Sequence, residues 1–191
     1  QPAWISWNRG KKGIVLDLST AEGREQAIQL VGEADVLVES FRPGDMADWG
    51  LAYDTLSQLY PRLVYCSITG FGQNGPLRRV KGYEGVVAAK AGRMLNLQGQ
   101  PTRDGPVYSA VYTGSWHTSQ AAVRGIIGAL RARDLTGKGQ PVHITMLNAN
   151  AWTNADEYYD HANRPSIAMP DDEIHGLHAL YRLYRCREGW V

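Results

Sequence analysis

Short apolar runs alternate with stretches of helical periodicity along the first 70 residues. Three apolar, β-branched runs predict buried strands, at 13–18, 35–39 and 63–68. The stretch at 19–32 has apolar side chains at helical spacing and begins with Ser19-x-x-Glu22, the pattern of a capping box, which predicts a helix. Two shorter helices are expected before the third run, at 46–49 and 53–59. This alternation is typical of parallel strands joined by helical crossovers.

The second half of the chain opens with a long irregular stretch. Residues 69–106 are rich in Gly, Pro and Arg and show helical spacing only at 84–94. Irregular segments of this length inside a compact domain usually serve a function. Helical periodicity returns at 113–133, followed by a strand pattern at 141–145 and a further helix at 147–161. The predicted fold class is α/β, a Rossmann-like parallel sheet with helices on both faces.

Charge and cysteine content narrow the possible roles. The 191 residues carry 20 Lys and Arg against 19 Asp and Glu, a net charge of +1, which gives no general field for a nucleic acid or a membrane surface. No apolar run approaches the ~20 residues of a membrane-spanning helix. Cys66 and Cys186 are too few for a disulfide framework, which favours a reducing compartment. We therefore expect a cytoplasmic protein that binds neither nucleic acid nor membrane.

Both ends of the sequence suggest a piece of a longer protein. The chain starts at Gln1 and leads at once into Trp4 and Trp7, as if entered in mid-domain. It stops on Trp190 and Val191, where the second strand of a hairpin would be expected to continue after the Glu-Gly turn signal.

Two patterns resemble ligand sites and are better explained otherwise. Gly70-x-Gly72-x-x-Gly75 matches the dinucleotide fingerprint, but Pro76 and the residues after it have no helical pattern to hold a pyrophosphate. A group of His and acidic residues after 160 fits no compact metal motif, so we expect a solvated polar loop and no metal. The three cations at 9–12 indicate either a solvated loop or a phosphate contact.

Several blocks in the same order carry a family resemblance. They are Asn8-Arg-Gly-Lys-Lys12, Leu16-Asp-Leu-Ser-Thr-Ala-Glu-Gly23, Ala34-Asp-Val-Leu-Val-Glu-Ser-Phe-Arg-Pro-Gly44, Pro61 to Pro76, Gly82-Tyr-Glu84 and Ala129 to Gln140. With them the chain, from about 7 to 150, resembles the class III CoA-transferases of the CaiB/BaiF type. That family includes formyl-CoA transferase, carnitine CoA-transferase and α-methylacyl-CoA racemase.

The resemblance implies an organisation and a set of ligands. Residues 1–164 would be part of the large domain of such an enzyme, and 165–191 a linker and the start of a second, small domain. The substrates would be an acyl-CoA, with CoA as the transferred group, and a small carboxylic acid. The protein would form an interlocked homodimer or work with a tandem partner domain.

The resemblance also implies a nucleophile that this chain lacks. In the transferases an Asp attacks the acyl-CoA thioester, which gives a mixed anhydride and then an enzyme thioester with CoA. That Asp stands four residues before a Gly, in Asp-x-x-Thr-Gly, and here the block reads Ala110-Val-Tyr-Thr-Gly114. Two cations of the transferases are also replaced, by Ser19 and Asp48.

Other site residues match the family. Ser40, Phe41 and Arg42 match residues that contact CoA, and Lys81 precedes Tyr83 and Glu84 in a segment that lines the reacting end. Arg9, Lys11 and Leu16 match further CoA contacts. Tyr83 stands where the racemases use a His as base, which counts against racemase chemistry.

Three functions stay open at this point. The first is a CoA-transferase homologue whose nucleophile at Ala110 was lost naturally or replaced by engineering. The second is a non-catalytic half that binds CoA or forms the scaffold of a dimer. The third is an acyl-CoA isomerase or lyase on the same scaffold.

Overall fold

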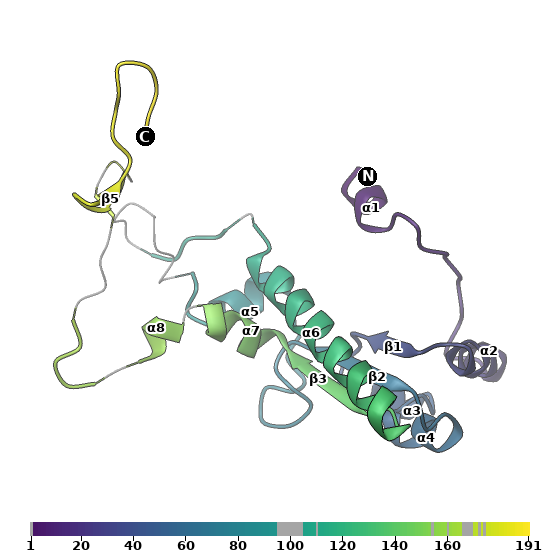
Figure 1. Cartoon of the computed structure of the whole chain (residues 1–191). Helices are drawn as coiled ribbons and strands as arrows, with labels where there is room; N and C mark the ends of the chain where they lie inside the picture. The colour runs from purple at the N-terminus through teal and green to yellow at the C-terminus, as the bar shows by residue number, and fades with distance from the viewer. Residues whose placement is uncertain are drawn as a thin grey trace.

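A three-stranded parallel sheet forms the centre of the molecule (Figure 1). The computed structural model describes residues 2–94, 105–109, 111–153, 155–159, 161–165, 170–171, 173 and 175–191. The strands are β1 (Val36–Glu39), β2 (Val64–Thr69) and β3 (Pro141–Thr145), in the order β1-β2-β3. Val38 is in register with Cys66, which is in register with Val142. The predicted parallel sheet is confirmed for these three strands.

Alternate side chains of β2 face two different hydrophobic cores. Val64 and Cys66 pack against Ala122 and Ala129 of α6 (Thr113–Thr136), which lies along β2 and β3 in Figure 1. Tyr65 faces the opposite side and packs against α2 (Ala21–Gly32), α3 (Asp45–Asp48) and α4 (Tyr53–Leu59). Because a strand alternates its side chains between faces, a strand buried on both sides needs helices on both. The predicted α/β class is therefore confirmed.

The helix after residue 19 forms, but with a different cap from the one predicted. The hydroxyl of Thr20, and not Ser19, accepts the hydrogen bond from the Gly23 amide at 3.1 Å. Ser19 instead donates its amide and hydroxyl to the Asp17 carboxylate, which lowers the pKa of Asp17. The capping box was misplaced by one residue, because Ser and Thr adjoin and either can cap.

The strand predicted at 13–18 is wrong. These residues form neither helix nor strand, and Ile14 and Val15 are 66% and 97% exposed. A strand is stable only when its backbone groups pair with a neighbour. Within the described residues no strand lies beside this segment, so its apolar residues do not become a core.

The remaining described elements are four helices and one pair of antiparallel strands. They are α1 (Pro2–Trp7), α5 (Glu84–Lys90), α7 (Met146–Thr153), α8 (Ala155–Tyr158), and the antiparallel strands β4 (Gly176–His178) and β5 (Tyr181–Arg182). Arg185 and Trp190 form the hairpin bridge expected around the final Glu-Gly turn. Within the described ranges, no helix is long and apolar enough to cross a bilayer.

Candidate functional site

A cavity of about 590 Å³ opens at the carboxyl ends of the three parallel strands. Ser40 to Pro43 follow β1, Ile68 to Gly70 end β2, and Met146 follows β3, and all of them line this cavity. The carboxyl edge is where ligands bind in open parallel sheets, because each strand there hands over to a connecting segment. The volume lies in the usual range for a small-molecule site.

One wall of the cavity is a loop whose two ends touch. A Cβ added at Gly70 would lie 2.4 Å from the Cα of Gly82, so the backbones meet where only glycine fits. The loop between them leaves β2 and returns to the same point. Gly72 donates its amide to the hydroxyl of Thr69 at 3.0 Å, which fixes the first turn. The contact holds residues 78–84 beside the end of the sheet.

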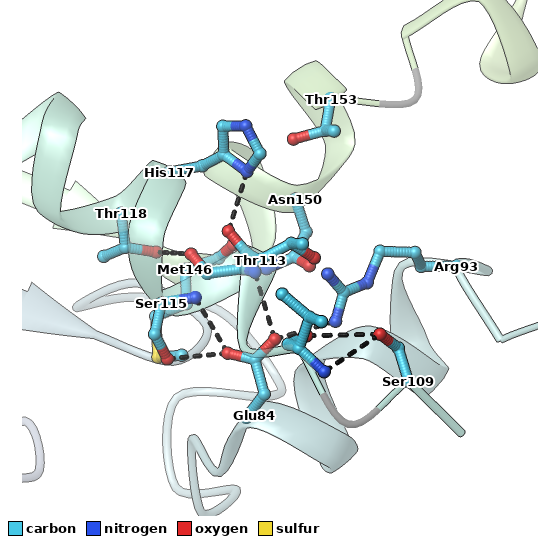
Figure 2. A network of polar contacts seen from close by, with 12 residues as sticks. Glu84, Arg93, Ser109, Thr113, Ser115, His117, Thr118, Met146, Asn150 and Thr153 are labelled. Carbon is cyan, nitrogen blue, oxygen red and sulfur yellow. Dashed lines mark hydrogen bonds and ion pairs between the residues drawn. The ribbon is translucent and has the colours of Figure 1, made fainter. Parts of the chain in front are cut away.

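Glu84 joins this loop to the first turn of α6 (Figure 2). Its Oε1 accepts from the Gly114 amide at 3.0 Å, and its Oε2 from the amide and hydroxyl of Ser115 at 2.8 and 2.6 Å. Helix N-termini carry unpaired amides and a partial positive charge, and a carboxylate satisfies both. Glu84 therefore caps α6 from a residue 30 positions earlier.

A buried arginine completes the charge balance of this carboxylate. Nη2 of Arg93 lies 2.7 Å from Oε1 of Glu84, and the two side chains are 5% and 12% exposed. Burial raises the pKa of Glu84, but the hydrogen bonds from Ser115, Gly114 and Arg93 outweigh it and the pKa is lowered. Glu84 is thus held as an anion and is a weak general base.

The residue matched to the family nucleophile, Ala110, lies outside the described residues. Its neighbours are tied together, since the hydroxyl of Ser109 accepts from the amide of Val111 at 3.2 Å and donates to its carbonyl at 3.3 Å. Figure 2 shows Ser109 on the same side of the α6 N-terminus as Glu84 and Arg93. The segment next to Ala110 therefore lies at this end of α6.

Some of the predicted site residues line the cavity, and others do not. Its lining includes the following predicted residues: Ser40, Phe41, Arg42, Lys81, Tyr83 and Glu84. Arg9, Lys11 and Leu16 do not line it. They belong to the N-terminal segment, where Arg9 and Lys11 are exposed.

Several residues at the site, with Arg78, Arg93 and Ser115 among them, were not predicted from the sequence. Arg78 and Ser115 line the cavity, and Arg93 pairs with Glu84. The signal in the sequence for Arg93 was its place just after an apolar helix. The spacing of residues along the sequence did not predict that Glu84 would be its partner. The described residues contain no group of three or more side chains placed to hold a metal ion.

A family model and individual relatives match this chain. The model for CoA-transferase family III matches residues 1–191. The succinate–glutarate CoA-transferase of Agrobacterium fabrum is 36% identical over 167 residues, which are 85% of this chain and 40% of that protein. The acetyl-CoA:oxalate CoA-transferase of Acetobacter aceti is 40% identical over 144 residues, 74% of this chain and 36% of that protein.

A solved structure matches over nearly the whole chain. The crystal structure of a CAIB/BAIF family protein from Brucella suis has a TM-score of 0.75 and 33% identity, and it covers 96% of this chain and 48% of that one. The chain thus spans less than half the length of these relatives. The family model, the relatives and the fold agree with the resemblance found in the sequence. The chain belongs to CoA-transferase family III.

Proposed function

We propose that this chain supplies the acyl-CoA cleft of an enzyme that moves CoA between an acyl-CoA and a small carboxylic acid. The observation that carries the proposal is the cavity at the sheet edge, which brings Ser40, Phe41 and Arg42 together with the segment at 81–84. These two groups are 40 residues apart in the sequence. The relatives named for oxalate, succinate and glutarate support a carboxylic acid as the acceptor.

We assign the two walls of the cleft to two parts of the ligand. Ser40, Phe41, Arg42 and Lys81 would contact CoA, whose phosphates suit the two cations. Tyr83 and Glu84 would line the acyl end, since Glu84 is bonded to the start of α6. The N-terminal segment that carries Arg9, Lys11 and Leu16 would contact CoA in the cleft of another copy or, after a movement, in this cleft.

The wider assembly is also a proposal. Residues 1–164 would belong to the large domain and 165–191 would lead into a second domain. An interlocked homodimer or a tandem partner would complete the site. Relatives from Chloroflexus aurantiacus named as α and β subunits of a succinyl-CoA–L-malate CoA-transferase support more than one chain type in such an assembly.

Ala110 favours a second candidate, a non-catalytic half that binds acyl-CoA. A methyl group cannot form an anhydride, and Glu84 cannot replace the nucleophile because four donors hold its oxygens. The chemistry would then come from an Asp elsewhere in the assembly.

Mass spectrometry of the intact protein separates the two candidates. The protein that contains this chain and its Ala110→Asp variant are each incubated with acetyl-CoA and succinyl-CoA. A carboxylate at 110 attacks the thioester carbon, and the CoA thiolate then attacks the anhydride, leaving CoA on the Asp and releasing the acid. We expect the variant alone to gain the mass of CoA less one water, because the released acid carries one oxygen of the Asp.

Each other outcome has a definite meaning. No adduct on the variant, with acyl-CoA still bound, supports the non-catalytic half. Transfer by the unmodified protein, with no other Asp-bearing copy present, contradicts the assignment of Ala110 to the nucleophile position. Absence of acyl-CoA binding in both proteins contradicts the proposed function itself.

A further inference from the structure

The cavity at the sheet edge has more positive charge than its acids balance. Arg42, Arg78 and Lys81 line it, and in the described part of the chain none of the three side chains has an ion pair. The acids on the lining are Asp45 and Glu84. Glu84 is already neutralised by Arg93, so its charge is not available to the other cations. A concave surface with unpaired cations attracts anions.

Arg78 is the member of this group that neither the sequence motifs nor the family resemblance assigned. It is in the closed loop between Gly70 and Gly82, where its amide bonds to the carbonyl of Gly75 at 3.4 Å. Two residues later the amide of Val80 bonds to the carbonyl of Leu77 at 2.9 Å. These turns place Arg78 on the cavity wall. Arg78 and Arg79 are both exposed, but Arg79 does not line the cavity.

Among the described residues, Lys81 has a side-chain partner for its charge, and Arg42 has a carboxylate beside its backbone. Nζ of Lys81 lies 6.0 Å from the centre of the Tyr83 ring, within range of a cation–π contact. The amide of Arg42 bonds to Asp45 at 3.3 Å, which brings a carboxylate close to that residue. The guanidinium of Arg78 therefore has its planar set of donors available, and this geometry matches a carboxylate or a phosphate in a two-point contact.

We infer that Arg78 binds an anionic group of the ligand in this cavity, a carboxylate or a phosphate. The inference rests on the proposed function in that the ligand is an acyl-CoA, whose phosphates and acyl carboxylate are the two sources of that charge. A carboxylate partner would make Arg78 a residue that selects acyl groups with a second acid. A phosphate partner would make it a CoA contact on the loop wall.

The test compares Arg78→Gln with Arg79→Gln in the 191-residue chain. Both variants remove one charge from adjacent positions, so they share any long-range effect and differ only in the cavity contact. Pyrophosphate and succinate are the first probes, titrated by NMR, and dissociation constants are then measured for acetyl-CoA and succinyl-CoA. We expect Arg78→Gln to weaken binding about tenfold and Arg79→Gln less than about twofold.

The probes identify the anion. Weaker binding of pyrophosphate and of both thioesters assigns Arg78 to phosphate. Weaker binding of succinate and succinyl-CoA, with acetyl-CoA unchanged, assigns it to the acyl carboxylate.

Failure of the inference differs from failure of the proposed function. Equal effects of the two variants, or wild-type protein that binds neither pyrophosphate nor succinate, overturn the role of Arg78. If Arg78→Gln weakens pyrophosphate binding but the wild-type protein binds no acyl-CoA, the role of Arg78 stands and the proposed function is overturned. A normal far-ultraviolet spectrum of both variants excludes misfolding as the cause.

Discussion

At the scale of single residues, the site depends on a carboxylate whose role is positional. Glu84 accepts hydrogen bonds from Gly114, from Ser115 twice, and from Arg93, so it ties the cavity loop, α5 and α6 to one point. The family resemblance predicted that Glu84 lies at the site. It could not predict Arg93, because the partner of a buried acid is set by the path of the chain and not by a local motif.

Glu84→Gln should destabilise the fold by about 3 kcal/mol at neutral pH, because it leaves the Arg93 charge buried without its partner. The native pKa of Glu84 is lowered, so its stabilisation is present above the ordinary value of 4.5. It is lost as the pH falls through the native value. The difference between wild type and variant in urea unfolding should therefore shrink as the pH falls below 4.5.

The matched control for this experiment is Glu22→Gln. Glu22 is also an acid in the first turn of a helix, but it is exposed. Among the described residues its side chain hydrogen-bonds with Gln26 alone, at 3.5 Å. Its loss should cost less than about 1 kcal/mol. Equal losses for the two variants would show that Glu84 acts only through the helix dipole and not through Arg93.

At the scale of elements, the positions of most helices and strands were predicted from the sequence. Which elements pack beside one another was harder to predict. The bounds expected for α4 and β3 match the structure. Helix α6 ends at Thr136, and Gly137 after it has the left-handed conformation expected of a C-cap. Local propensity and periodicity determine such features. The segment at 13–18 has an equally strong strand pattern, but a strand also requires a neighbour, and that information is not local.

Two glycines of α6 should respond to alanine in opposite directions. A Cβ at Gly128 meets nothing within 4 Å, so Gly128→Ala should stabilise the helix by up to about 1 kcal/mol. A Cβ at Gly125 would lie 2.7 Å from Cγ1 of Val142, a stiff side chain on β3, so Gly125→Ala should cost about 1 kcal/mol net. Thermal unfolding of the two variants measures both signs. Stabilisation by both would mean that α6 can shift away from β3.

At the scale of the whole molecule, the chain exposes more surface than its mass predicts. Its accessible surface is 13799 Å², whereas a compact monomer of 21.1 kDa exposes about 9000 Å². Trp4 and Trp7 on α1 and Trp116 on α6 are more than half exposed, although Trp7 and Trp116 lie within 6.5 Å of each other. This excess supports the proposal that other protein covers part of the chain.

The isolated 191-residue chain should therefore self-associate. Light scattering should give a mass above 21.1 kDa, and the unfolding temperature should rise with protein concentration, because association stabilises the folded state by mass action.

Two single variants locate the contact. Val38 is 51% exposed on β1, which has no second neighbour among the described strands, and Ile127 is 61% exposed on α6. Val38→Lys should restore a monomer if association occurs through the strand edge, and Ile127→Lys if it occurs through the outer face of α6. A single 21.1 kDa species with a concentration-independent unfolding temperature would contradict the prediction and remove the surface argument for a partner.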